Sequence, residues 1–316
     1  MPEWLYEAGI GEARAALVAD NRILEARIEP DDVAIRVGTV TAARLIEITR
    51  PGREGRITLD DGSEATLSPL PPGITQGARL TVRIVREAIP EAGRPKRPRS
   101  MPSDEAPAHG PDLLARIIAT GHPVRTLRSH ESDALEQAGW SEVLEEAMIG
   151  EIAFPGGALR MTPTPAMTLF DVDGTGPLES LALAAATAVA EAILRHDIGG
   201  SIGIDFPTIT GKAPRLAVAA AIDAALPQPF ERTAVNGFGF LQIVRPRIHA
   251  SLLERLRADP AAAKTRALLR QIERIPPPAP RQHHVSARLL ATLAAHPTWV
   301  EDLARRTGVA PTFELR

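Results

Sequence analysis

Strands and helices alternate between residues 164 and 247, and no other feature restricts the fold of this chain as strongly. After a hairpin around Pro155-Gly156-Gly157, the pattern predicts a strand ending in FDVDG, a long helix ending at Gly199, a buried strand SIGIDF, a helix GKAPRLAVAAAIDAAL and two strands, FERTAV and FGFLQIVRPR. Such alternation is typical of an α/β layer with some parallel strands. We therefore expect a fold of the α/β (α+β) class.

The first part of the chain has a different pattern. The segments ARAALVA and ILEARI flank Asp20-Asn21, which predicts a hairpin. Over residues 37–86, short strands alternate with turns that contain proline and glycine. Several short strands at regular spacing indicate a small barrel. We expect an OB-type barrel over residues 37–89, which would serve as a substrate-binding module.

A proline-rich segment and several helical patterns follow the barrel. Residues 90–111 are interrupted repeatedly by proline and predict an extended linker. Residues 112–149 predict helices, with Ser132 as the N-cap of the second. Residues 250–273 also predict a helix. Residues 275–281 contain four prolines and break the chain, and beyond them residues 284–316 predict two helices and a terminal strand.

The composition excludes several function classes. A net charge of -3 excludes a uniformly basic nucleic-acid binder, although a local basic strip remains compatible with it. The absence of cysteine excludes disulfides, thiolate nucleophiles and cysteine-ligated zinc. No signal peptide is predicted, and the longest apolar stretch, residues 181–194, is too short to span a membrane. We expect a cytoplasmic protein without a membrane partner.

Two apolar strands end in carboxylates, Asp171 in LFDVDG and Asp205 in IGIDFP. The carboxyl ends of strands face the functional crevice of an α/β layer, and the helix between these two strands is long enough to make them parallel neighbours. Converging carboxylates repel each other unless a cation lies between them, and Mg²⁺ or Mn²⁺ suits that role. Asp173 shares a strand face with Asp171 and could also reach the metal, or it could belong to a simple turn.

Several cations could contact phosphate. Arg245 and Arg247 are two residues apart on one expected strand, Lys212 opens a helix after the Asp205 strand, and the linker carries Arg94, Lys96 and Arg97. For each of these cations a solvated surface position is the alternative, and for Arg245 and Arg247 the pattern alone favours it. The histidines lack a partner at metal spacing, and no serine lies in a GxSxG context, so neither supports a catalytic assignment.

The blocks GGALRMTPTPAMTLFDVDG, RHDIGGSIGIDFPTIT and VNGFGFLQIVRPR, in this order and spacing, resemble the ribonuclease E/G family. The opening strands, parts of the barrel and VEDLARRTGVAPTFELR resemble the family more weakly. The resemblance implies an RNase H-like scaffold over residues 1–36 and 112–163, interrupted by the barrel and the linker. A DNase I-like catalytic layer over residues 164–273 and a C-terminal helical and strand segment over residues 284–316 would complete it.

The resemblance also implies an activity, namely endonucleolytic hydrolysis of single-stranded RNA that leaves 5′-phosphate ends. Asp171 and Asp205 would bind Mg²⁺, with Mn²⁺ as the alternative. Asp173 stands where the family usually has Asn, which puts the usual hydrogen-bonding role of that position in doubt.

Other departures from the family concern binding, sensing and assembly. Residues 37–89 contain no Phe, Tyr or Trp, so the family's aromatic contacts to bases are missing. No segment is long enough for a sensor of the 5′ end, and Gly237 and Gln242 replace residues that are typically Arg and Glu. Without cysteine, the zinc link between subunits cannot form, so a zinc-linked tetramer is not expected and other oligomers stay open.

These observations lead to the hypothesis of a compact endoribonuclease that is indifferent to the 5′ end. Two alternatives stay open. The first is a non-catalytic RNA-binding protein that retains the ribonuclease E/G fold, and the second is a regulatory partner of a larger ribonuclease.

Overall fold

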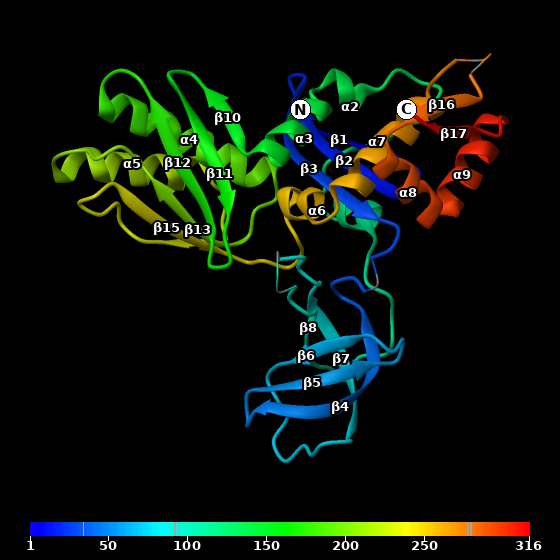
Figure 1. Cartoon of the computed structure of the whole chain (residues 1–316). Coiled ribbons are helices and arrows are strands. Elements are labelled where there is room, and N and C mark those ends of the chain that lie inside the picture. Colours follow the sequence, from blue (N-terminus) through cyan, green and yellow to red (C-terminus); the bar gives the residue numbers. More distant parts are fainter. Residues whose placement is uncertain (34, 92, 94, 277, 279) are drawn as a thin grey trace. The chain divides into compact units, whose positions relative to one another are not determined.

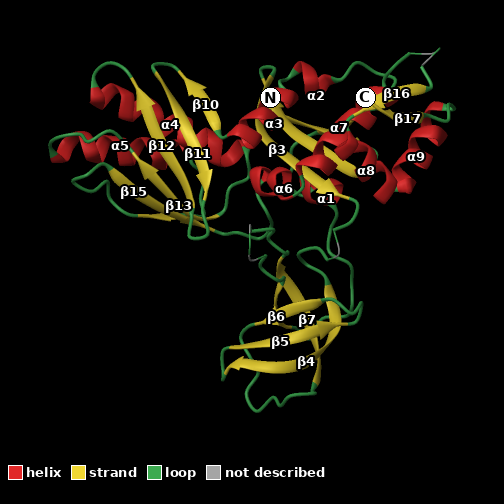
Figure 2. Cartoon of the chain, viewed as in Figure 1, coloured by secondary structure: helices red, strands yellow, loops and turns green. Residues whose placement is uncertain are grey.

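The computed structural model describes residues 1–33, 35–91, 93, 95–276, 278 and 280–316 (Figure 1). The chain divides into two compact units, each assembled from segments that are distant in the sequence. Unit 1 comprises Met1–Val33, Leu113–Ser141 and Leu256–Arg316, and unit 2 comprises Ala34–Asp112 and Glu142–Arg255. Helices and strands occur in both units (Figure 2), which confirms the expected mixed α/β class.

Unit 1 contains a four-stranded sheet in the order β3-β2-β1-β9. Its strands are β1 (Glu3–Ala8), β2 (Glu12–Ala19), β3 (Arg22–Pro30) and β9 (Val124–Thr126). The first three are antiparallel, and β9 runs parallel to β1. Asp20 and Asn21 form the turn between β2 and β3 with φ of 50° and 57°, values that Asp and Asn tolerate. The expected hairpin is therefore confirmed, whereas β9 is too short to carry a periodic signal and was missed.

The two faces of this sheet differ in chemistry. On one face Trp4, Ala15 and Leu17 pack against α1 (Leu113–Ile118). On the other face, buried charged residues of β1 and β2 meet cations of the C-terminal segment. Burial of apolar surface on the first face stabilises the unit by about 25 cal/mol per Å².

A buried ion cluster covers the second face. Arg14 donates to Glu7 at 2.8 Å through Nε and to Asp133 at 2.5 Å, and it is almost wholly buried. Arg274, which follows α7 (Pro260–Glu273), pairs with the same two carboxylates at 2.8 and 3.2 Å. Burial opposes ionisation of Asp133, but Arg14 and Arg274 outweigh that effect and hold its pKa below the usual range. These charges are therefore neutralised inside the fold.

The remaining elements of unit 1 refine the sequence-based expectations. They are α2 (Ala134–Gln137), α8 (Ala287–Ala295), α9 (Pro297–Thr307) and the parallel strands β16 (Gln282–Val285) and β17 (Thr312–Leu315). Ser132 is not the N-cap of α2, because the side chain of Asp133 accepts the backbone N–H groups at the helix start instead. β16 was missed, since it directly follows the prolines that marked a break.

The helix expected over residues 250–273 is two helices, α6 (Leu252–Ala258) and α7. Asp259 separates them, and its side chain accepts from Ala262 N at 2.9 Å. Pro260 occupies the first turn of α7, where a missing N–H costs nothing. Asp259-Pro260 thus starts a second helix inside a segment whose apolar periodicity is continuous, so the periodicity alone did not reveal the break.

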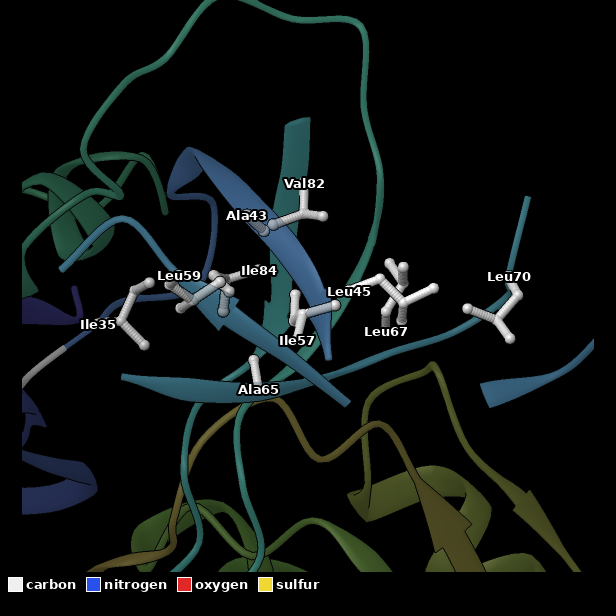
Figure 3. Packing of buried hydrophobic residues seen from close by; sticks show 10 residues of the cluster. All are labelled: Ile35, Ala43, Leu45, Ile57, Leu59, Ala65, Leu67, Leu70, Val82 and Ile84. Atoms are coloured by element: carbon white, nitrogen blue, oxygen red, sulfur yellow. The ribbon is translucent and has the colours of Figure 1, made fainter. Parts of the chain in front are cut away.

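Five strands in unit 2 form a closed barrel in the order β4-β5-β6-β8-β7. They are β4 (Val40–Arg50), β5 (Glu54–Leu59), β6 (Glu64–Leu67), β7 (Arg79–Arg86) and β8 (Arg99–Pro102). Aliphatic side chains from these strands, among them Leu45, Ile57, Leu67 and Ile84, fill its interior (Figure 3). The barrel expected from the strand pattern is therefore confirmed.

The prediction of an extended linker over residues 90–111 is wrong for residues 99–102, which form strand β8. This strand pairs with β6 in parallel and with β7 antiparallel, and so closes the barrel. Ser100 is fully buried and donates to Thr66 O at 3.2 Å. Proline is tolerated at the ends of a short strand, and here Pro98 directly precedes β8 while Pro102 is its last residue, so a proline-rich composition did not exclude a strand.

A six-stranded mixed sheet forms the rest of unit 2, in the order β10-β11-β12-β13-β15-β14. Its strands are β10 (Glu151–Phe154), β11 (Gly157–Pro163), β12 (Thr168–Gly174), β13 (Gly200–Asp205), β14 (Glu231–Arg232) and β15 (Phe240–Arg245). The hairpin expected around Pro155-Gly156-Gly157 joins β10 to β11.

Two helices accompany this sheet, α4 (Leu178–Arg195) and α5 (Lys212–Ala225) (Figure 1). α4 packs on β10, β11 and β12, and α5 packs beside α4. The helix α3 (Trp140–Ile149) spans a boundary between the units. In the part of the chain that the structure describes, no helix combines the length and apolar character needed to cross a membrane.

Candidate metal centre

Asp171 and Asp205 lie side by side on adjacent parallel strands. β12 and β13 pair in a register that sets Phe170 opposite Ile204 and Asp171 opposite Asp205. Paired strands are about 4.8 Å apart, and residues in register point to the same face. The predicted parallel arrangement of these two strands is confirmed, and it follows from the crossover through α4.

The two carboxylates project from the open face of the sheet. Phe170, Val172 and Ile204 alternate with them and are buried on the opposite face, which the helices cover. Both aspartates are exposed. Within the described residues, neither accepts a hydrogen bond nor forms an ion pair, and like charges placed opposite each other on a sheet destabilise it.

A row of polar and aromatic side chains crosses the open face at the level of this pair. The strand registers align Glu151 of β10, Arg160 of β11, Asp171, Asp205 and Phe240 of β15. Arg160 is exposed and faces Asp171 across the strand pair. It was missed, although the alternation in GALRMTP places it on the exposed face once the hairpin is fixed.

Asp173 lies on the same face, two residues beyond Asp171 and opposite Ala158. It has no partner on β13, whose pairing with β12 ends at Asp205. Among the residues described, no group of three or more His, Cys, Asp and Glu side chains is close enough to hold a metal. A metal at this edge of the sheet would therefore have only Asp171 and Asp205 as carboxylate ligands and would need water or substrate oxygens besides, which is a number of carboxylates that Mg²⁺ accepts.

Lys212 lies at the same end of β13 as Asp205. It is the first residue of α5 and is exposed, and Gly211 precedes it with φ of +91°. Arg215, one turn later, donates through Nε to Gly211 O at 3.0 Å. These two cations border the carboxyl end of the strand that carries Asp205.

Arg245 and Arg247 are not near the carboxylate pair. Arg245 is in register with Gly200, at the opposite end of β13 from Asp205, and donates to Ile198 O at 3.4 Å. Arg247 lies beyond the end of β15 and pairs with Glu91 at 2.9 Å and with Glu254. The predicted shared strand face for these two arginines is wrong, because β15 ends at Arg245, before Pro246.

The basic residues after the barrel are engaged with carboxylates. Lys96 contacts Glu91 at 2.5 Å, and Arg97 contacts Glu64 at 2.9 Å. Burial opposes ionisation of Glu91, but hydrogen bonds from Lys96 and Arg247 outweigh it and hold the pKa of Glu91 below its usual range. Arg94, the third cation predicted for this segment, lies outside the described residues.

Comparison with protein-family models and with curated protein sequences finds no match for this chain.

Proposed function

We propose that this protein is a divalent-metal-dependent endoribonuclease that cleaves single-stranded RNA, with Asp171 and Asp205 as the metal ligands. The single observation that carries the proposal is the register of these residues on β12 and β13. Two exposed carboxylates in register, with no cation paired to them in the described chain, leave a negative site whose repulsion a divalent cation would relieve.

The carboxylate pair fits Mg²⁺ better than softer metals. Its donors are hard oxygens, and the chain offers no thiolate. Mg²⁺ held there would supply charge that stabilises the scissile phosphate and would activate water as the nucleophile. Mn²⁺ would suit the same oxygens, and no zinc site is proposed.

The neighbouring residues would orient the substrate. Arg160 faces Asp171 across the strand pair, and Lys212 lies at the carboxyl end of the Asp205 strand. Both would attract phosphate oxygens that lie on either side of the carboxylate pair. Asp173 would accept a hydrogen bond from water or from a ribose hydroxyl near Asp171.

The finer fold assignments support this function. We infer that the barrel is of the OB type, since its closing strand β8 lies between β6 and β7 and pairs in parallel with β6. The order β3-β2-β1-β9, with three antiparallel strands and a parallel fourth, supports an RNase H-like scaffold in unit 1. The six-stranded mixed sheet with α4 and α5 supports a DNase I-like catalytic layer.

A non-catalytic RNA-binding protein is the second candidate. Two observations bear on how strongly its barrel would bind RNA: the absence of aromatic residues from 37–89, and the pairing of Lys96 and Arg97 with carboxylates. Both indicate a barrel that binds RNA weakly, which is compatible with either function.

A cleavage assay on 5′-labelled single-stranded RNA, with Mg²⁺ or with EDTA, separates the two. Endonucleolytic products that require Mg²⁺ and disappear in both Asp171→Asn and Asp205→Asn support the enzyme. Binding of RNA without any metal-dependent cleavage supports the alternative, and cleavage that survives either substitution excludes the assigned site. Equal rates on 5′-monophosphate and 5′-triphosphate substrates are expected, because no sensor of the 5′ end is proposed.

A further inference from the structure

Phe238 is far more exposed than the fold requires. The residue is 83% accessible, and among the described residues it is the one aromatic residue that counts as an exposed large hydrophobic. Burying a phenylalanine stabilises a protein by about 1.5–3 kcal/mol, so this residue contributes almost none of that here. An aromatic ring held in water points to a contact with something outside the folded chain.

The turn that carries Phe238 holds its backbone firmly. Asn236 Oδ1 accepts from the backbone N–H groups of Phe238 and Phe240 at 2.9 and 3.0 Å. Gly239 N donates to Asn236 O at 3.2 Å, and Thr208 Oγ1 donates to Phe238 O at 3.3 Å. Hydrogen bonds thus hold both the N–H and the C=O of Phe238, so less conformational entropy is lost when a ligand stacks on its ring.

This turn adjoins the carboxylate pair. Phe206, the residue after Asp205, donates its N–H to Gly239 O at 3.2 Å. Phe240 is the register partner of Asp205, so Phe238 lies two residues beyond the level of the pair, at the same end of the sheet. β13 and β15 lie next to each other in the sheet (Figure 1).

Cations lie beside the same turn. Arg215 Nη1 is 3.5 Å from the position that a Cβ on Gly237 would occupy, and Lys212 is exposed one turn earlier on α5. An aromatic platform next to cations is the arrangement that binds single-stranded nucleic acid, with the ring stacking on a base and the cations meeting the backbone.

From these observations we propose that Phe238 is a stacking platform for one RNA base adjacent to the scissile phosphate, with Arg215 and Lys212 contacting the flanking phosphates. The inference rests on the proposed function and assigns it a substrate subsite. It also supplies the aromatic contact to bases that residues 37–89 lack. Stacking accepts every base, so this subsite positions the strand without reading its sequence.

Binding to RNA in EDTA tests this subsite separately from cleavage. The probe is a single-stranded RNA with 2-aminopurine at successive positions, whose fluorescence falls when the modified base stacks. The wild-type protein is expected to quench the 2-aminopurine fluorescence at one RNA position. Phe238→Ala loses this quenching and weakens RNA binding by about 5- to 150-fold, as expected for one stacked base. Phe238→Trp keeps the quenching. Leu216→Ala, which removes an exposed apolar side chain of α5 outside this turn, leaves binding unchanged.

Cleavage kinetics with Mg²⁺ complete the test. Phe238→Ala raises KM with a much smaller change in kcat, because the ring contacts a base and not the reacting atoms. If Phe238→Ala binds RNA within twofold of the wild type, or if Phe238→Trp fails to quench while remaining folded, the stacking proposal is wrong and the endoribonuclease proposal stands. If the wild type quenches at one position through Phe238 but never cleaves, the endoribonuclease proposal is wrong and the subsite stands. If the wild type binds no RNA, both are wrong.

Discussion

At the residue scale, Asp171 and Asp205 are exposed and lie opposite each other on neighbouring strands, which lowers the stability of the fold. Like charges in register on neighbouring strands repel, and no cation pairs with either of them within the described residues. The neighbouring residues Phe170 and Ile204 are buried and hold the register. A one-residue slip of β12 or β13 would bury a carboxylate and expose these apolar side chains, so the core itself fixes the site.

Glycine 239 is the residue whose replacement tests the turn beside this site. Its φ is +95°, and a Cβ there would lie 2.3 Å from Phe206 O. Gly239→Ala is therefore expected to lower the free energy of unfolding by about 1–3 kcal/mol and to reduce RNA cleavage, because Phe206 and the adjoining Asp205 must shift. Chemical denaturation and the cleavage assay measure the two effects.

Gly237→Ala is the matched control for this substitution. Its Cβ would lie no closer than 3.5 Å to Arg215 Nη1, an ordinary van der Waals contact. If both variants lose stability equally, the close approach of Gly239 to Phe206 is not what constrains the turn.

At the element scale, the C-terminus of α4 contains a buried histidine that makes unit 2 sensitive to pH. His196 is fully buried, and its Nε2 lies 3.1 Å from Glu146 Oε2. Burial lowers the pKa of His196, although Glu146 opposes this. Burial alone would raise the pKa of Glu146, but His196 and Arg195 outweigh it and lower that pKa.

Both shifts act in the same direction on stability. The unfolded chain binds a proton on His196 near its ordinary pKa of about 6.5, where the folded chain does not, so folding weakens as the pH falls below that value. The lowered pKa of Glu146 adds stability above its unfolded pKa that is lost at still lower pH. We expect the free energy of unfolding of unit 2 to decrease steadily from pH 7 to pH 5, and His196→Gln to flatten this dependence.

Denaturant unfolding followed by circular dichroism at several pH values measures this slope. His130→Gln, which alters an exposed histidine of unit 1, is the control and should keep it. If the free energy of unfolding of His196→Gln depends on pH as steeply as that of the wild type, His196 is not the source of this pH dependence.

Periodicity predicted most of these elements, and its failures have physical causes. The strands that carry Asp171 and Asp205 were predicted because their apolar runs are bounded by a hairpin and a long helix. β8 was missed because proline signals breaks wherever it occurs, including beside a strand. The shared face of Arg245 and Arg247 was wrong because strand ends are set by pairing partners, which lie elsewhere in the chain. Phe238 was not singled out, since exposure is a property of the folded turn and the segment FGF looks equally apolar throughout.

At the scale of the whole molecule, unit 1 joins both ends of the chain, and its buried ions connect them. Arg274 from the C-terminal segment and Arg14 from β2 share Glu7 and Asp133. Every tryptophan of the chain, at positions 4, 140 and 299, belongs to unit 1. Tryptophan fluorescence therefore follows the unfolding of unit 1, while circular dichroism follows both units.

Arg14→Met tests this division. Removing the guanidinium leaves buried carboxylates short of a partner, so unit 1 should lose about 3–5 kcal/mol and the fluorescence transition should move to lower denaturant. The ion pair of the exposed Arg305 with the half-buried Asp302 offers the control, because Arg305→Met should cost less than about 1 kcal/mol. Equal shifts of the fluorescence transition for the two variants would contradict this account.

Restoring cleavage by changing the metal tests the carboxylate pair most directly. Asp205→Cys introduces the sole thiolate of the chain, a soft ligand that Mg²⁺ disfavours and Mn²⁺ accepts more readily. We predict that this variant loses at least about 100-fold in RNA cleavage with Mg²⁺, the scale of losing a major electrostatic contact, and regains much of it with Mn²⁺. Asp205→Asn should stay inactive with both metals. Equal activity of Asp205→Cys with both metals, whether high or absent, would contradict a metal held by Asp171 and Asp205.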